Sequence, residues 1–336
     1  MPTTSTERCY YLDLAKVMTA LLVIFGHLYS EDSSVRLHLY AFHLPLFLII
    51  SGVFHKYSGK IDFKSYAQRI LWPAAIFLVL QLVANVSIHG QSLANELRNI
   101  FVDIPRGIIH GPIWFLFALF WCKVFLDIFL RFRNKVFPIM IWAGLLLIPI
   151  YIFKGFLPLG MSQGMMSFPF YLAGFYFGDY LKSRPQSFKW APVFAACLLL
   201  TVLITKLQGR VSILQLRFGG LGITSLGSEY VKSSLLYKGF VQGANIVLYY
   251  LNGFIGSVMV LSLALLPFPK FDFIKALSKS LITVVGTQSL FTTVYRLSVG
   301  YDKGLLLSAG VSICILFLCY LLHLILQPVY DLVRQK

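Results

Sequence analysis

The chain has 336 residues, of which 58% are hydrophobic and only 12% are charged, and its mean hydropathy is +0.77. Soluble globular domains contain about 25% charged residues, so this chain has too little polar surface to cover a fold that faces water. The composition therefore excludes an ordinary soluble domain and predicts an integral protein of the lipid bilayer.

The net charge of +16 comes from 29 Lys and Arg against 13 Asp and Glu. In a soluble protein this balance would indicate nucleic acid as a partner. Membrane proteins, however, collect Lys and Arg in their cytoplasmic loops, and no basic run interleaved with stacking aromatic residues is present. We therefore expect no nucleic-acid partner. The five cysteines lack CxxC spacing, so we also expect no zinc site and no other bound metal.

A membrane-spanning helix needs about 20 mostly apolar residues, and ten segments of the sequence come close to this length. In chain order they are residues 11–29, 39–54, 70–88, 113–130, 136–153, 165–181, 190–205, 244–266, 281–299 and 305–326. Pro169, Gly174 and Gly178 interrupt the sixth. The sequence therefore predicts an all-α fold, a polytopic transmembrane helical bundle of about ten spans that forms a single domain over residues 1–336.

The distribution of Lys and Arg predicts how this bundle is oriented. An even number of spans places both termini on one side, and the loops on that side hold most of the Lys and Arg. Because cytoplasmic loops are enriched in these residues, we expect both termini to be cytoplasmic. Residues 206–243 then form a long external loop, which is either a substrate-facing segment or a plain connector.

The first span carries three ionisable side chains, Asp13, Lys16 and His27. A helix turns about 100° per residue, so the step from Lys16 to His27 returns to within about 20° of its start. Asp13 and Lys16 are an i,i+3 pair, and all three residues therefore share one helix face. Lipid would reject that face, so it must look into the bundle. Asp13, Lys16 and His27 are candidate catalytic residues, although Lys16 alone is equally consistent with an interfacial lysine.

A second imidazole, His43, lies near the external end of the second span and is close to His27 in the sequence. Two histidines without an accompanying carboxylate or thiolate give a poor metal site. Histidine titrates near neutral pH without assistance, so an acid–base role for one His with the other positioning it is favoured. The fourth span begins with Trp114 and Phe115, a pattern that an aromatic belt at the membrane interface also explains.

Basic residues also cluster at the cytoplasmic ends of neighbouring spans, among them Lys64 and Arg69. Cations there are able to hold the phosphates of an anionic cofactor. The enrichment of Lys and Arg in cytoplasmic loops is sufficient to explain most of the cluster. Arg69 is the residue we retain, because it precedes Pro73 at the foot of the third span, close to the expected depth of Lys16.

Six short motifs together resemble the acyltransferase-3 family of bacterial membrane acyltransferases. They are Leu12-Asp13-Leu14-Ala15-Lys16 with Gly26-His27; Phe42-His43-Leu44-Pro45-Leu46-Phe47 with Ser51-Gly52; Arg69-Ile70-Leu71-Trp72-Pro73; Gly111-Pro112-Ile113-Trp114-Phe115-Leu116; Phe170-Tyr171-Leu172-Ala173-Gly174-Phe175-Tyr176-Phe177-Gly178; and Gly286-Thr287-Gln288-Ser289-Leu290. Each motif alone is weak, but their order over most of the chain makes the resemblance specific.

The resemblance implies transfer of an acyl group, commonly acetyl, from acyl-CoA to a sugar hydroxyl of a cell-surface glycan or lipid-linked precursor. It also implies location in the bacterial cytoplasmic membrane. The essential histidine of similar proteins corresponds to His27, and their basic residue corresponds to Lys16. Their Arg-x-x-Arg pair is matched by Arg69 alone, because Tyr66 occupies the first position. The motif residues Ser51, Trp114 and Phe115 are expected to line the substrate pocket.

Two further readings of the residues stay open. Ionisable side chains on an inward face also fit a transporter or flippase of a glycan or lipid-linked sugar, although the two halves of the chain show no convincing repeat. A structural subunit of an envelope complex is the other alternative. For acyl transfer, His27 acts either as a general base or as a transient acyl carrier. His27 lies roughly 16 Å above Lys16 along the helix, whereas the CoA donor arrives from the cytoplasm.

Overall fold

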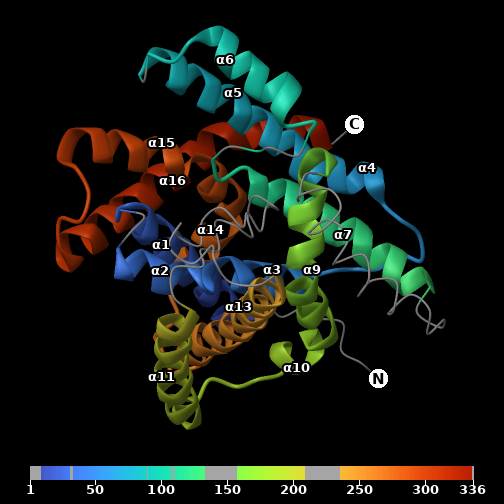
Figure 1. Cartoon of the computed structure of the whole chain (residues 1–336), viewed down its shortest axis with the longest axis vertical. Coiled ribbons are helices and arrows are strands. Elements are labelled where there is room, and N and C mark those ends of the chain that lie inside the picture. Colours follow the sequence, from blue (N-terminus) through green and yellow to red (C-terminus); the bar gives the residue numbers. More distant parts are fainter. Residues whose placement is uncertain are drawn as a thin grey trace.

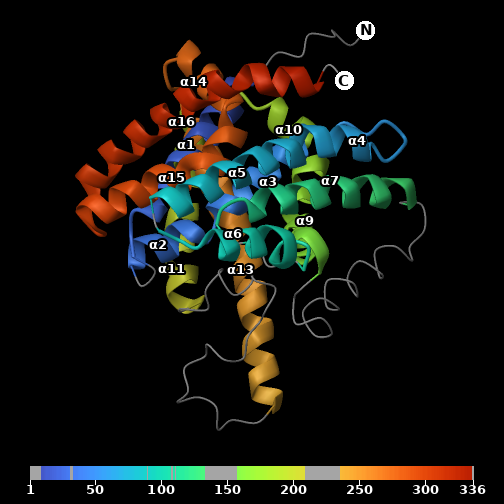
Figure 2. The ribbon, with the colours of Figure 1, turned by 90° about the horizontal axis from the view of Figure 1, so that it is seen from above.

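The computed structural model of the protein describes residues 9–30, 33–88, 90–106, 109, 111–132, 157–208 and 235–334. Throughout these residues the regular structure is helical, with no β-strand. The predicted all-α fold is therefore confirmed. Figures 1 and 2 show the helices from two perpendicular directions.

The first part of the chain forms the helices up to α7. They are α1 (Tyr10–His27), α2 (Ser34–Tyr40), α3 (His43–Val53), α4 (Phe63–Tyr66), a π-helical turn (Ala67–Leu71), α5 (Trp72–Ser87), α6 (Leu93–Arg98), a second π-helical turn (Asn99–Asp103) and α7 (Trp114–Phe132).

The second part begins with a short 3-10 turn and ends with the longest helices. Its elements are Pro158–Gly160 (3-10), α9 (Met161–Tyr176), α10 (Gly178–Lys182), Phe188–Trp190 (3-10), α11 (Ala191–Gln208), α13 (Leu235–Ala264), α14 (Asp272–Lys279), α15 (Leu281–Val299) and α16 (Leu305–Arg334).

Six helical segments among the described residues are long and apolar enough to cross a membrane. They are Tyr10–His27, Ser34–Val53, Phe63–Ser87, Phe188–Lys206, Val247–Ala264 and Leu305–Leu332. Helices α7, α9 and α15 occupy three more of the ten expected spans, and the expected span at 136–153 lies outside the described residues. The count of ten and the cytoplasmic placement of the termini stay predictions.

Two expected boundaries differ from the structure. The second span is broken at Ala41 and Phe42 into α2 and α3, and the sixth is broken at Phe177 into α9 and α10. Helix α11 runs to Gln208, and α13 begins at Leu235, so both ends of the expected loop 206–243 are helical. The middle of that loop, residues 209–234, lies outside the described residues. The N-terminal half of α13 projects from the bundle in Figure 2.

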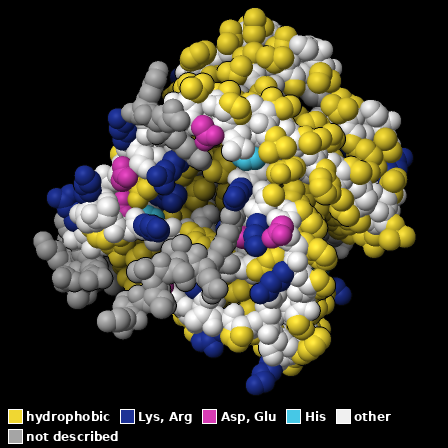
Figure 3. Space-filling model, turned by 180° about the vertical axis from the view of Figure 1, so that it is seen from behind, with side chains coloured by type: hydrophobic (Ala, Val, Ile, Leu, Met, Phe, Trp, Pro, Cys, Tyr) yellow, Lys and Arg dark blue, Asp and Glu magenta, His cyan; other side chains and the backbone are white. Residues whose placement is uncertain are grey.

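Helix α1 occupies the centre of the bundle. It packs against α2, α3, α13, α14, α15 and α16, and α5 and α7 lie beyond this layer (Figure 1). On their far sides the surrounding helices present large apolar side chains, as α16 does with Leu306 and Ile325, which are 90% and 71% exposed. Broad hydrophobic areas cover much of the surface in Figure 3, while Lys and Arg gather around a hollowed part. This is the arrangement expected of a protein surrounded by lipid.

Glycines allow α3 and α9 to approach closely. A Cβ added at Gly52 would collide with the backbone carbonyl of Tyr171, and one added at Gly174 would collide with the carbonyl of Ile49. In a membrane the hydrophobic effect does not drive helices together, so helix association depends on close van der Waals packing. Small residues at helix crossings allow this close packing. Two of the sequence motifs, which contain Gly52 and Gly174, therefore meet in space.

We expect Gly174→Ala to destabilise the protein by about 1–3 kcal/mol, because the backbones of α3 and α9 would have to separate. Gly310→Ala is the matched control, since a Cβ at this position of α16 meets nothing within 4 Å. The measurement is thermal unfolding of the detergent-solubilised protein. Equal melting temperatures for the two variants would contradict the close crossing.

Candidate active site

Within the part of the chain that the structure describes, one cavity lies around Lys16 and another around His27. The first, which we call the cationic cavity, has a volume of about 360 Å³ and is walled by α1, α3, α7, α14, α15 and the π-helical turn Ala67–Leu71. The second, which we call the histidine cavity, has a volume of about 250 Å³ and is walled by α1, α2, α3, α5, α7 and α15. The polar face of α1 therefore serves both cavities.

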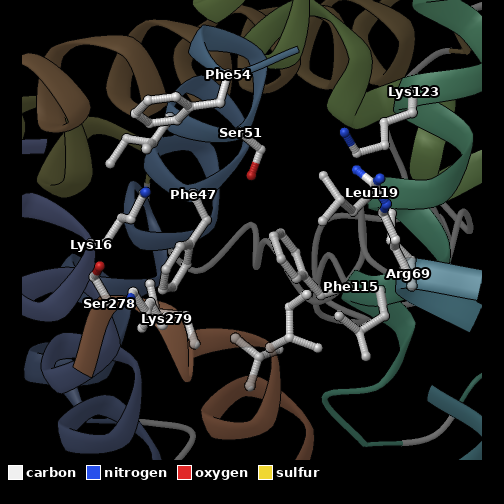
Figure 4. Close-up of a pocket in the computed structure, with 16 residues that line it drawn as sticks. Lys16, Phe47, Ser51, Phe54, Arg69, Phe115, Leu119, Lys123, Ser278 and Lys279 are labelled. Carbon is white, nitrogen blue, oxygen red and sulfur yellow. The ribbon is translucent and has the colours of Figure 1, made fainter. Parts of the chain in front are cut away.

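Four cations line the cationic cavity: Lys16, Arg69, Lys123 and Lys279. Lys16 and Lys279 lie on one side, and Arg69 and Lys123 point into the cavity from the other side (Figure 4). Among the described residues of this wall there is no Asp or Glu. The rest of the wall is mostly apolar, with Phe47 and Phe115 between the two groups of cations. Such a cavity fits an elongated ligand that is polyanionic at one end and apolar along its length.

Asp13 stands behind Lys16 and is not itself part of the cavity wall. Its carboxylate is buried and accepts hydrogen bonds from Lys16 Nζ at 3.5 Å and from Ser278 Oγ at 2.8 Å. These hydrogen bonds join α1 to α14 beside the cavity. Asp13 holds the ammonium group of Lys16 in place rather than offering a carboxylate to a ligand.

Lys123 is a cation that sequence reasoning did not find. Its Nζ lies 5.2 Å from the centroid of the Tyr66 ring and 5.9 Å from that of Tyr171. Tyr66 occupies the position where an Arg-x-x-Arg pair would place its first arginine, and α7 brings Lys123 to the same place from another part of the chain. The sequence signal that could have identified Lys123 is the presence of a lysine inside an apolar span.

The hydroxyl of Tyr66 belongs to a buried polar network centred on Asp127. It donates to Asp127 Oδ2 at 2.9 Å, and His55 Nε2 donates to Asp127 Oδ1 at the same distance. The Tyr171 hydroxyl lies 2.9 Å from His55 Nδ1. Burial lowers the pKa of His55, which lies beyond the end of α3. A neutral imidazole that donates through Nε2 and accepts through Nδ1 satisfies every contact, so this network supports the wall behind Lys123.

Lys64 and Ser51 are placed differently from each other. Lys64 is exposed and lines neither cavity, whereas Ser51 lies in the wall of the cationic cavity (Figure 4). Trp114 lines the histidine cavity, and Phe115 lines both. Of the expected substrate-pocket residues, Ser51 therefore lies on one side of Phe115 and Trp114 on the other.

Tyr40 joins the two expected histidines. Its hydroxyl lies 2.9 Å from His27 Nδ1, and its ring centroid lies 4.7 Å from that of His43. His43 Nδ1 is 2.7 Å from the carbonyl oxygen of Leu39, which only accepts, so this nitrogen carries the proton. Both imidazoles line the histidine cavity, but they communicate through Tyr40 rather than by direct contact. Tyr40 precedes His43 by three residues in a broken helix, which the expected continuous span concealed.

Phe115 and Val285 line both cavities. The space around Lys16 and the space around His27 therefore adjoin at these two side chains, which we call the partition. Lys16 and His27 therefore line cavities that adjoin at Phe115 and Val285. Within the described residues, no group of three or more His, Cys, Asp or Glu side chains is arranged to hold a metal ion.

Comparison with known proteins gives two matches. The acyltransferase-3 family model, described as an acyltransferase domain, matches residues 10–324. Nodulation protein NolL of Mesorhizobium japonicum is 28% identical over 200 residues, which cover 53% of this chain and 50% of that protein. The match thus spans about half the length of this relative. No solved structure matches the chain.

We expect Asp127→Ala to lower the stability of the protein by about 3 kcal/mol or more, because His55 and Tyr66 would each lose a buried partner. Asp179→Ala is the control, since the side chain of Asp179 is fully exposed. Thermal unfolding in detergent measures both. A melting temperature for Asp127→Ala equal to that of the control would show that the network does not support the wall.

Proposed function

Because the chain belongs to the acyltransferase-3 family, we propose that this membrane acyltransferase moves an acyl group, commonly acetyl, from acyl-CoA to a sugar hydroxyl. The proposed acceptor is a cell-surface glycan or a lipid-linked sugar, and the proposed location is the bacterial cytoplasmic membrane. The observation that carries the proposal is the pair of neighbouring cavities, one lined by four cations and the other by His27 and His43, that share Phe115 and Val285.

The cationic cavity is the proposed donor site. The phosphate groups of CoA carry several negative charges, and Lys16, Arg69, Lys123 and Lys279 supply matching cations. Charge-assisted hydrogen bonds to phosphate are among the stronger polar contacts in proteins. The pantetheine arm then extends along the apolar wall past Phe47 and brings the thioester to the partition. Asp13 orients Lys16, and Lys64 takes no part.

The histidine cavity is the proposed acceptor site. His27 accepts the proton of the sugar hydroxyl while the hydroxyl oxygen attacks the thioester carbonyl carbon. The new C–O bond forms, the C–S bond breaks, and CoA leaves as the thiol after the proton returns from His27 to sulfur. Tyr40 fixes the imidazole of His27, and His43 supports Tyr40 through ring contact. Trp114 offers an apolar face to the sugar ring.

We expect His27→Ala to remove one ester from the surface glycans of cells that express the protein, because the attacking hydroxyl loses its base. Mass spectrometry of the glycans measures the loss at matched membrane abundance of the two proteins. An unchanged ester content would contradict the catalytic role of His27. Unchanged esters combined with blocked glycan export would favour a transporter.

We expect Lys123→Met to raise the KM for acetyl-CoA roughly tenfold or more, because a buried contact to phosphate is lost. The KM for the acceptor should not change. Initial rates of radiolabelled acetyl transfer in membrane vesicles measure both constants. Lys64→Met is the matched control, since Lys64 is exposed and outside the cavity. Equal effects of the two substitutions would place the donor elsewhere.

A further inference from the structure

Three side chains in the wall of the histidine cavity carry buried polar atoms that have no hydrogen-bond partner within the described protein. In the described part of the chain, Gln288 has no partner for either atom of its amide, Gln81 has none for Oε1, and Ser289 has none for Oγ. Gln288 is completely buried. These atoms include acceptors that need a donor and donors that need an acceptor.

This cluster is costly for the folded protein when neither water nor a ligand pairs with it. A buried amide or hydroxyl without a hydrogen bond loses the free energy of its contacts with water and gains nothing in return. Buried polar groups in proteins are nearly always paired for this reason. Three unpaired groups in the wall of one cavity therefore point to a ligand that completes them.

The packing of α5 against α15 brings the two amides to the same cavity. A Cβ added at Gly286 would collide with the ring of Phe77, so only glycine allows α15 to approach α5 this closely. Gln81 lies one turn after Phe77 on α5, and Gln288 and Ser289 follow Gly286 on α15. The neighbouring Thr287 is satisfied within its own helix, because its hydroxyl donates to the carbonyl of Thr283 at 2.7 Å.

A second glycine makes room for Gln81. Gly111 has a φ of +71° and precedes α7, and a Cβ at this position would lie 2.8 Å from Gln81 Nε2. Only a glycine adopts this backbone conformation without strain and leaves the space that the amide fills. Two motifs, Gly111-Pro112-Ile113-Trp114 and Gly286-Thr287-Gln288-Ser289, therefore contribute to one wall of the cavity.

We propose that Gln81, Gln288 and Ser289 form the subsite that holds neighbouring hydroxyl groups of the acceptor sugar ring. The inference rests on the proposed function and identifies how the acceptor is recognised. A sugar hydroxyl both donates and accepts, as this mixed set of atoms requires. A phosphate or carboxylate only accepts, so it would leave the amide oxygens of Gln81 and Gln288 unpaired. Trp114 and His27 line the same cavity, which places the bound ring beside the base.

The test uses Gln288→Met, which keeps the volume of the side chain and removes the amide. Membranes that contain the protein are supplied with radiolabelled acetyl-CoA and increasing amounts of surface glycan. The glycan is taken from cells that lack the protein. The half-saturating concentration of glycan should rise roughly tenfold or more, because hydrogen bonds to the sugar are lost. The half-saturating concentration of acetyl-CoA should not change. Thermal stability should be unchanged, because methionine fills the same space and the removed amide has no hydrogen-bond partner within the described protein.

Gln163→Met is the matched control. Gln163 is buried in α9, its amide oxygen accepts a hydrogen bond from Ser162 Oγ at 3.1 Å, and it lines neither cavity. This variant should lose thermal stability and retain the wild-type half-saturating concentration of glycan. A change of half-saturation shared by both variants, or absent in both, would overturn the inference.

Gly111→Ala is a second variant, because its Cβ would displace the amide of Gln81 without removing a polar group. It should also raise the half-saturating concentration of glycan, and a wild-type value would contradict the placement of Gln81 in the subsite.

The outcomes of these experiments separate the proposed subsite from the proposed function. A wild-type protein that transfers no acetyl group would overturn the proposed function, whereas an active wild type with a fully active Gln288→Met would overturn only the subsite.

Discussion

Ionisable and strongly polar side chains in a hydrocarbon layer must face protein rather than lipid, and this constraint determines the position of α1. Asp13, Lys16 and His27 share one face of that helix, so it needs protein neighbours along its whole length. The surrounding α3, α13, α14, α15 and α16 supply them. Because Lys16 and His27 are separated along the helix, they line two different cavities. The division into two cavities, which are the proposed donor and acceptor sides, follows from this single helix face.

Glycines set the shape of what surrounds α1. At Gly52 and Gly174 the backbones of α3 and α9 meet, and at Gly286 the backbone of α15 meets the ring of Phe77. Gly256 on α13 makes a similar approach to the ring of Phe42. Several short motifs of the sequence thus describe contacts between helices rather than groups that react. The polar residues beside these glycines, Ser51 and Gln288, are the ones that the close contacts carry into the cavity walls.

The parts of the fold that depend on local pattern were predictable from the sequence. Hydropathy and helical periodicity identified most helices and the polar face of α1, because both are properties of one segment at a time. The position of Lys123 beside Tyr66, the link through Tyr40 and the Asp127 network were not predictable. Each depends on which helices pack together, and spacing along the chain carries no information about that. For the same reason Lys64, which is near Arg69 in the sequence, lies outside the cavity that Arg69 lines.

The partition of Phe115 and Val285 addresses a problem that any such enzyme faces, since a thioester beside a general base is open to attack by water. Phe115 and Val285 lie between His27 and the four cations of the cationic cavity, while Arg36 and Arg296 line the histidine cavity itself. In the proposed reaction the remaining risk is water in the histidine cavity itself. A sugar ring that pairs with Gln81, Gln288 and Ser289 fills that cavity and displaces water from it. Water at the same amides forms hydrogen bonds but lacks the fixed geometry that aims an oxygen at the thioester, so these unpaired groups favour the sugar hydroxyl over water as the attacking group.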